Sequence, residues 1–176
     1  DQKDIEQITQ IIQGYEDTLT LIDTANRTIT LKMPIKKIVA VTGDAAEAIR
    51  GLHATNRVVG VSVDTLDDAT YLPDFSKMPS VGKWSEPDIE TILTLEPDLA
   101  ISYKSAASKY LEPKLNGTGI PIVALDLYRA DDLPAEMKLL GYIVGKTDYA
   151  DEYLKFFYNI TDSIQSETSK LPADKK

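Results

Sequence analysis

The sequence predicts an α/β fold built around a mainly parallel sheet, and two observations lead to this prediction. From Lys37 onward, short runs of β-branched residues alternate with segments whose apolar residues recur every three or four positions, a pattern typical of βα units. In addition, a chain of 176 residues with 43% hydrophobic content is large enough for one sizeable core and one ordinary domain.

Two other elements are expected before the βα units. Four isoleucines share one helical face within residues 5–13, so we expect a short amphipathic helix there. Residues 18–22 and 28–31 alternate apolar and polar side chains on either side of the turn-forming stretch 23–26. This arrangement predicts a β-hairpin.

Four strands and four helices are expected in the βα region. The predicted strands are residues 38–41, 58–61, 99–102 and 122–125. The predicted helices are residues 45–52, 88–95, 105–115 and 131–144. A short polar side chain before a helix can accept a hydrogen bond from its first free amides, so Asp44, Ser105 and Asp131 are expected to act as caps.

The remaining segments are a long loop and a long helix. Residues 65–83 contain two prolines and a glycine and are expected to form a loop without regular elements. Apolar and aromatic residues recur at helical spacing further on, which predicts a helix over residues 148–170. We expect this aromatic stripe to pack in the core.

Composition and charge disfavour several classes of function. The formal net charge of −9 opposes binding to nucleic acids or anionic membrane surfaces. Without cysteine the chain can form no disulfide, thiolate metal site or iron–sulfur cluster. Its single histidine, His53, is expected at a helix end on the far side from the carboxyl ends of the strands, and not as a ligand or catalyst. No apolar run approaches the roughly 18 residues of a membrane span.

The sequence lacks the common motifs for phosphate binding and nucleophilic catalysis. It contains no G-x-G-x-x-G, G-x-x-x-x-G-K-[ST] or G-x-S-x-G. An enzyme domain remains an alternative, in which Asp44 or Asp64 would act as a base on an anionic small molecule at a strand end. Another alternative is a single-lobe interaction module that attaches to a further domain through its N-terminal helix.

Three stretches of the sequence resemble a known family. They are residues 34–41 (PIKKIVAV), 56–61 (NRVVGV) and, most specifically, 87–101 (PDIETILTLEPDLAI). These stretches resemble the substrate-binding proteins of ABC importers, above all those that capture iron–siderophore complexes, haem or cobalamin. The resemblance covers residues 20–169 and corresponds to one lobe of a two-lobed protein.

The resemblance implies a Rossmann-like, three-layer lobe with a mainly parallel sheet, an N-terminal β-hairpin and a long C-terminal helix. Two such lobes are joined in the family by one rigid helix. Residues 18–147 look like the N-terminal substrate-binding lobe and residues 148–176 like the inter-lobe helix and a tail, while the second lobe is missing. Residues 1–17 would form a short helix or linker, and their beginning, DQKDI, is similar to the end of a dockerin-type calcium loop.

The function that the resemblance implies is that of a binding protein and not of an enzyme. The expected role is the extracytoplasmic component of an ABC importer, which captures a metal chelate of the iron–siderophore type, haem or a corrinoid and delivers it to a membrane permease. The resemblance implies no cofactor. It also implies that the full-length protein is anchored to the membrane.

A binding site is expected where the parallel strands end, because ligands of open α/β sheets lie outside the carboxyl ends of the strands. Aromatic side chains would offer flat apolar surface to a ring-bearing ligand or chelate, and basic ones would neutralise an anionic chelate. The expected ligand-binding residues are Thr42, Gly43, Asp44, Asp64, Tyr71, Lys83, Trp84, Ser85, Tyr103, Lys104, Tyr128 and Arg129. The alternative for the aromatic residues is packing against the protein's own loops, and for the basic residues simple solvent exposure.

Glu90 is expected to dock on the permease. In the family, a glutamate at the start of the matching helix projects from the lobe and pairs with arginines of the membrane permease. The alternative is that Glu90 only stabilises its own helix, because the helix dipole favours acidic residues in the first turn.

Overall fold

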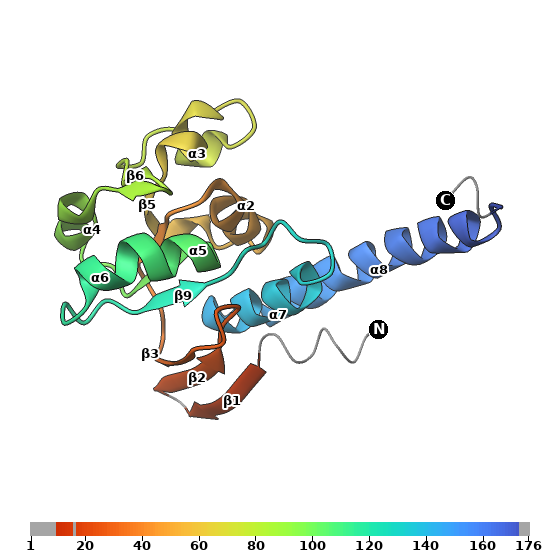
Figure 1. Cartoon of the computed structure of the whole chain (residues 1–176), viewed down its shortest axis with the longest axis horizontal. Coiled ribbons are helices and arrows are strands. Elements are labelled where there is room, and N and C mark those ends of the chain that lie inside the picture. The colour runs from red at the N-terminus through yellow and green to blue at the C-terminus, as the bar shows by residue number, and fades with distance from the viewer. Residues whose placement is uncertain (1–9, 16, 173–176) are drawn as a thin grey trace.

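The centre of the molecule is a four-stranded parallel sheet (Figure 1). The computed structural model describes residues 10–15 and 17–172. The strands are β4 (Ile38–Ala40), β5 (Val58–Val61), β8 (Leu99–Ser102) and β9 (Ile122–Ala124), in the order β5-β4-β8-β9. All neighbouring pairs are parallel, so the predicted α/β sheet is confirmed, with β4 and β9 one residue shorter than expected.

Both faces of this sheet are buried. Successive strand residues enter two separate cores, because side chains alternate between the faces of a strand. Ile38 and Ile101 belong to the first core, whereas Val39 and Ala100 belong to the second. This double burial explains why the strands are continuous apolar runs in the sequence.

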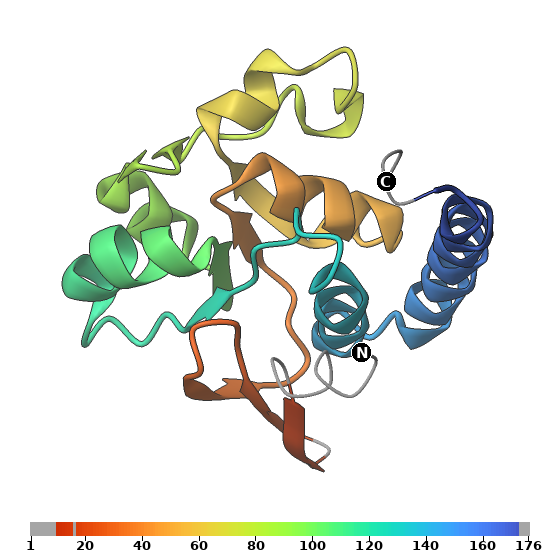
Figure 2. The ribbon, with the colours of Figure 1, turned by 45° about the vertical axis from the view of Figure 1, so that its right-hand side comes forward.

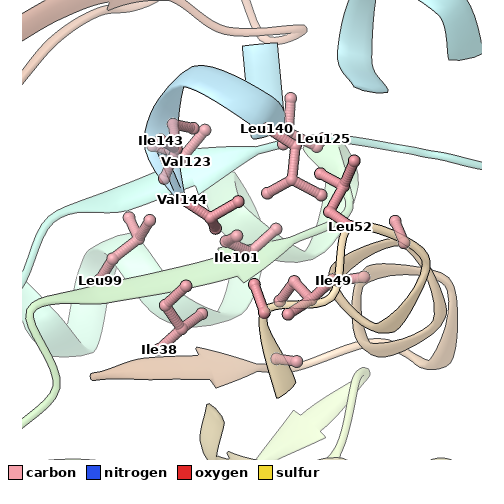
Figure 3. Close-up of a cluster of buried hydrophobic side chains, with 14 of the residues drawn as sticks. Ile38, Ile49, Leu52, Leu99, Ile101, Val123, Leu125, Leu140, Ile143 and Val144 are labelled. Atoms are coloured by element: carbon pink, nitrogen blue, oxygen red, sulfur yellow. The ribbon is translucent and has the colours of Figure 1, made fainter. Parts of the chain in front are cut away.

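Helices cover each face and complete the three layers. The first core lies under α2 (Gly43–Gly51) and α7 (Leu133–Ile143), and Figure 3 shows side chains of both helices meeting the strands. The second core lies under α4 (Ile89–Leu95) and a helical stretch over residues 104–115. A 3-10 turn, Thr55–Arg57, leads into β5. All four predicted helices are confirmed.

The helical stretch over residues 104–115 changes its winding along its length. It consists of α5 (Lys104–Ala106), a π-helical segment η3 (Ala107–Leu111) and α6 (Glu112–Leu115). Periodicity alone does not distinguish these forms, since their apolar residues still face the second core.

The cap of α2 differs from the expectation. Thr42, and not Asp44, accepts the hydrogen bond from the amide of Ala45, at 3.3 Å. The helix begins earlier than predicted, so that Asp44 falls inside the first turn, where its charge still favours the helix dipole.

The caps predicted at Ser105 and Asp131 are also wrong. Ser105 lies inside α5, whose first amide, that of Lys104, donates to the Asp126 carboxylate at 2.9 Å. Asp131 lies one residue before the cap position of α7, which Asp132 occupies without a side-chain hydrogen bond. A proline in the first turn of α7 removes one of the amides that a cap would serve.

Residues 65–83 do not form one irregular loop as expected. A short helix, α3 (Val63–Asp67), precedes a 3-10 turn at Pro73–Phe75, whose phenylalanine is fully buried in the first core. The stretch ends in β6 (Gly82–Lys83), which pairs with β7 (Glu86–Pro87) as a short antiparallel ribbon. Packing on the core orders these short elements, which local propensity does not reveal.

The N-terminal part forms a separate antiparallel sheet of β1 (Gln10–Tyr15), β2 (Thr18–Ile22) and β3 (Thr28–Lys32). The predicted hairpin is confirmed as β2 and β3. The helix expected over residues 5–13 is wrong from residue 10 onward, and its first part lies outside the described residues. Pairing with the free edge of β2 supplies backbone hydrogen bonds there, and β-branched isoleucines favour a strand.

A buried aspartate fixes the hairpin to the central sheet. The Asp23 carboxylate accepts hydrogen bonds from the amides of Ala25 and Arg27 in the turn, both at 3.0 Å. It also accepts one from the amide of Ala124 in β9, at 2.9 Å. The Arg27 guanidinium pairs with Asp23 and reaches Glu112 in α6. The hairpin is therefore an integral part of this lobe.

The last helix, α8 (Thr147–Ser169), is the long helix that the sequence predicted. The expectation that its aromatic stripe packs in the core is confirmed only for Tyr153, which is half-buried against the first core, whereas Phe156 is 62% exposed and Ala150 is the only fully buried residue of the helix. Figures 1 and 2 show why: α7 lies along its first part only, and the rest extends past the other elements. No helix in the described part of the chain, α8 included, is both long and apolar enough to cross a membrane.

Candidate functional site

The segments that follow the four parallel strands carry most of the expected site residues. β4 leads into Thr42 and Gly43, and β5 leads into α3, which contains Asp64. β8 leads into Tyr103, and β9 into residues 125–132, which we call the β9–α7 loop. The strand order brings these segments side by side at one edge of the sheet.

Three aromatic side chains from three different segments meet at this edge. The Trp84 and Tyr103 ring centroids lie 5.8 Å apart with the ring planes at 70°. The Tyr103 and Tyr128 centroids lie 5.5 Å apart at 88°. These are edge-to-face arrangements of the kind that aromatic pairs favour. We call these three residues the aromatic cluster.

The outer members of the aromatic cluster remain open to solvent. Trp84 is 39% exposed and Tyr128 is 60% exposed, whereas Tyr103 between them is half-buried. Tyr103 thus supports two rings whose surfaces are free to meet a ligand. Packing against the protein's own loops explains the half-buried position of Tyr103. It does not explain why Trp84 and Tyr128 remain exposed.

Two acidic residues flank Tyr103. Its hydroxyl donates a hydrogen bond to the carboxylate of Asp44. Burial, followed by this hydrogen bond and the nearby negative charges of Asp44 and Asp64, raises the pKa of Tyr103 far above its ordinary value. The phenol therefore stays neutral and keeps donating, which fixes the orientation of the central ring.

The three expected basic residues differ in how free their charges are. Lys83 on β6 and Lys104 at the start of α5 are exposed. Arg129 is paired with Asp132, with 3.0 Å between Nε and Oδ2. The two lysines are thus better placed to neutralise an anionic ligand than the arginine is.

Tyr71 lies along α2 and not in the aromatic cluster. Its hydroxyl donates to the Glu47 carboxylate at 2.7 Å, and the Arg50 guanidinium carbon sits 5.6 Å from its ring centroid. The hydrogen bond to Glu47 is the main cause that raises the pKa of Tyr71. Tyr71 is half exposed, and its side-chain contacts are with residues of α2.

The smaller expected residues have mainly structural roles. Thr42 is buried and caps α2, so its side chain is not free to contact a ligand. Gly43 opens α2, and Ser85 is half-buried in the turn beside Trp84. In residues 10–15 and 17–172 no group of three or more His, Asp or Glu side chains could hold a metal ion.

Glu136 contacts the loop that carries Tyr128, and the sequence did not predict this contact. Its fully buried carboxylate accepts hydrogen bonds from the amides of Asp126 and Leu127, at 2.8 and 2.6 Å. Burial raises the pKa of Glu136 to about 7, against the effect of these two hydrogen bonds. The sequence signal that could have revealed Glu136 is its place as a lone acidic residue on the apolar face of the helix predicted over residues 131–144.

Glu90 and His53 lie outside the aromatic cluster. Glu90 is exposed in the first turn of α4, a position open to a partner. His53 follows the end of α2 with a φ of 53° and packs on Tyr149 of α8, with 4.4 Å between ring centroids. His53 therefore connects two helices and lies apart from the aromatic cluster.

Residues 38–176 match the sequence model of the family described as periplasmic binding protein. YvrC of Bacillus subtilis, described as an uncharacterized ABC transporter substrate-binding lipoprotein, is 25% identical over 90% of this chain and 50% of its own length. The vitamin B12-binding protein of Pectobacterium atrosepticum is 28% identical over 58% of this chain and 37% of its own. The chain thus spans about half the length of the curated relatives that it matches, or less.

Solved structures show the same fold. The molybdate-binding periplasmic protein MolA of Haemophilus influenzae aligns with a TM-score of 0.79 and 20% identity, over 88% of this chain and 55% of its own. The periplasmic vitamin B12-binding protein BtuF of Vibrio cholerae aligns with a TM-score of 0.67 and 20% identity, over 78% and 52%. The predicted three-layer α/β lobe is confirmed by these alignments.

Proposed function

The chain belongs to the periplasmic binding protein family, and we propose that it is one lobe of the extracytoplasmic solute-binding component of an ABC importer. The match to an ABC transporter substrate-binding lipoprotein over most of the chain supports this role. Proteins of this family bind substrates and are not enzymes, which argues against the enzyme alternative. A membrane anchor on the full-length protein is part of the proposal.

The proposed ligand is a metal chelate of the iron–siderophore type, haem or a corrinoid. The observation that carries this proposal is the aromatic cluster, whose outer rings are exposed at the carboxyl edge of the sheet. Flat apolar faces suit large ring-bearing ligands, whereas a small oxyanion such as molybdate is held by converging hydrogen-bond donors. Lys83 and Lys104 would balance the acid groups of such a ligand.

The test is a titration of the protein with vitamin B12, haem, a ferric siderophore complex and molybdate. Trp84 is the only tryptophan, so its fluorescence reports directly on the aromatic cluster. Tyr128→Ala should weaken binding about tenfold or more, because it removes an exposed ring. Tyr142→Ala is the matched control, since Tyr142 is an exposed tyrosine on α7. Preferential binding of molybdate, or equal effects of both variants, would contradict the proposed ligand class.

We further propose that α8 connects this lobe, residues 18–147, to a second lobe that is not part of this chain. The exposed stripe Phe156, Ile160 and Ile164 recurs every four residues and would be covered by that lobe. The relatives' lengths, about twice the matched region, support this proposal. In a longer protein that contains the second lobe, α8 should resist proteolysis. In this chain the exposed half of α8 should be cut first. Equal rates of cleavage in the two proteins would contradict the proposed cover by a second lobe.

Docking on the permease through Glu90 is also a proposal. The exposure of Glu90 at the start of α4 supports it. Glu90→Arg in the full-length protein should abolish ligand-stimulated transport without changing ligand affinity, because it reverses the charge offered to the permease. Glu86→Arg, on the neighbouring exposed glutamate, is the matched control. Unchanged transport by Glu90→Arg would rule out the assignment.

A further inference from the structure

Three of the four asparagines in the chain begin the tripeptide Asn-x-Ser/Thr. They are Asn26, Asn116 and Asn159, each with a threonine at the third position. Ser and Thr together make up 26 of the 176 residues, so fewer than about one such tripeptide is expected by chance among four asparagines. In a secreted protein this tripeptide is the acceptor sequence for N-linked glycosylation. The excess therefore indicates an acceptor site in this chain.

The backbone decides which of the three tripeptides can serve as an acceptor. All three asparagines are exposed. A transferase must also draw the asparagine and the threonine two residues later into its own site, so the tripeptide has to leave its contacts in the folded lobe. Exposed turns with few contacts meet this requirement best.

Asn116 lies in such a turn. It follows α6 with a φ of −59° and a ψ of 129°, and residues 116–119 are all exposed. The amide and the hydroxyl of Thr118 both donate to the Leu115 carbonyl, at 3.1 and 2.7 Å, and these contacts lie within the turn itself. In the described part of the chain, no atom beyond the chain neighbours lies within 4 Å of a Cβ built at Gly117 or Gly119. The tripeptide can therefore open without disturbing either core.

The tripeptide of Asn26 is held more firmly. Its middle residue, Arg27, is paired with the buried carboxylate of Asp23 and with Glu112 on α6. Opening this tripeptide would break the contacts that fix the hairpin to the central sheet.

The tripeptide of Asn159 is part of a regular helix. Asn159 and Thr161 both lie inside α8, and the Thr161 hydroxyl donates to the Phe157 carbonyl at 3.0 Å. A transferase would have to unwind the middle of α8 to reach it.

The turn of Asn116 lies at the amino ends of the parallel strands. It leads into β9, whose other end carries the β9–α7 loop with Tyr128 (Figure 1). Because α4 leads back to the start of β8, its first turn with Glu90 also lies toward the carboxyl ends. A sugar chain on Asn116 would thus leave both the aromatic cluster and Glu90 free.

A hollow beside Asn116 offers polar surface to a sugar. Its volume is about 490 Å³, and its lining includes Ser108, Glu112 and Asn116 itself. Hydroxyl and carboxylate groups can hydrogen-bond to the hydroxyl groups of a sugar ring. The first sugar of a chain attached to Asn116 can therefore rest against α6.

We propose that Asn116 carries an N-linked glycan. The Nδ2 atom of Asn116 forms a bond to the anomeric carbon of an oligosaccharide that is carried on a polyprenyl phosphate or diphosphate. The bond from that carbon to the phosphate oxygen breaks, the lipid phosphate leaves with the electron pair, and Nδ2 gives one proton to a base of the transferase. The inference goes beyond the binding role but rests on the proposed extracytoplasmic location, where such a transfer takes place.

The test is mass spectrometry of the full-length protein isolated from the cells that naturally produce it. Trypsin cuts after Lys and Arg, which separates the three tripeptides into residues 4–27, 115–129 and 156–170. Peptide 115–129 should carry an intact oligosaccharide, and fragment ions should locate it on Asn116. Only an intact sugar counts, because an Asn-Gly sequence also loses ammonia spontaneously to give Asp.

Variants produced in the same cells identify the acceptor. Asn116→Gln should remove the oligosaccharide, and so should Thr118→Val, which removes the hydroxyl but keeps the size of the side chain. Thr118→Ser should retain it. Asn56→Gln is the matched control, since Asn56 is the exposed asparagine outside these tripeptides. Asn116→Gln should bind the compounds of the titration panel as the unchanged protein does.

The outcomes that contradict the two proposals differ. Peptide 115–129 found only without sugar, in protein recovered from outside the cytoplasm, would overturn the glycan. Sugar on peptides 4–27 or 156–170 alone, or sugar that persists in Thr118→Val, would overturn it as well. Retention of the protein in the cytoplasm, measured by cell fractionation, would instead contradict the proposed function.

Discussion

The helices α7 and α8 are consecutive and pack on each other, yet they are buried to opposite extents. Seven of the eleven residues of α7 are buried, including Leu140 and Ile143 in the first core. Of the 23 residues of α8, only Ala150 is buried. Both helices contain apolar residues at helical spacing, so the amphipathic pattern alone does not determine which of them enters the core.

The difference comes from the position of each helix relative to the sheet. α7 lies between the sheet and α8, so that its apolar residues have partners on two sides. α8 contacts α7 through its first turns and then extends beyond the layers, which leaves Phe156, Ile160 and Ile164 exposed. The stability of this lobe should therefore depend on α7, and the outer half of α8 should contribute little.

The largest expected effect is that of Leu140→Ala in α7. Leu140 is fully buried in the first core, so its truncation leaves a cavity between α7 and the sheet. The free energy of unfolding should fall by about 2–5 kcal/mol, as measured by urea denaturation. Tyr142→Ala, on the exposed face of the same helix, provides the control and should change it little. A small effect of Leu140→Ala would mean that α7 is not the principal cover of the sheet.

The second effect is the pH dependence that Glu136, on α7, gives to the free energy of unfolding. Its folded pKa of about 7 lies above the unfolded value near 4.5, so the stabilisation is full below about pH 4.5 and is lost as the pH rises through about 7. Between pH 5 and 8 the loss should be on the order of 2–3 kcal/mol relative to Glu136→Gln. Urea denaturation of both proteins across this range measures it. Parallel pH profiles would show that the folded pKa is not raised.

The third effect concerns the contact between the two helices. A Cβ atom added at Gly141 would lie 2.7 Å from the Cβ of Ala150, closer than real Cβ contacts allow. Gly141→Ala should destabilise the lobe by about 1 kcal/mol net, because the overlap outweighs the gain in helix propensity. The double variant Gly141→Ala with Ala150→Gly restores the space and should recover much of the loss in thermal unfolding. Additive losses in the double variant would show that the helices do not meet at this point.

Much of the fold was predictable because its signals are local. The strands of the parallel sheet are short apolar runs that can be buried on both faces, and the helices between them keep one apolar face. The strand at residues 10–15 was not predictable in this way, because pairing with β2 decides its conformation. The exposure of Phe156, Ile160 and Ile164 on α8 was not predictable for a related reason: periodicity reveals an apolar face but not its partner.

The sequence was sufficient to place the candidate site at the carboxyl ends of the parallel strands, but not to predict its contacts. Tyr103 and Tyr128 follow from the rule that ligands lie at the carboxyl ends of parallel strands. Trp84 lies in the turn between β6 and β7, and the structure brings it together with them. Tyr71 satisfies the same rule but contacts α2, since the path of the long segment 65–83 depends on packing. Glu136 was missed because its partners are backbone amides, which leave no mark on the sequence.

The smallest expected effect is that of a substitution in the exposed half of α8. Phe156→Gln replaces a side chain that is 62% exposed on α8, with little change in helix propensity. The free energy of unfolding of this chain should change by less than about 0.5 kcal/mol, in contrast to the loss at Leu140. The variant should also reduce self-association at high concentration, because it interrupts an exposed apolar stripe. A loss above about 1 kcal/mol would mean that the stripe already packs within this chain, and α8 would then need no second lobe to cover it.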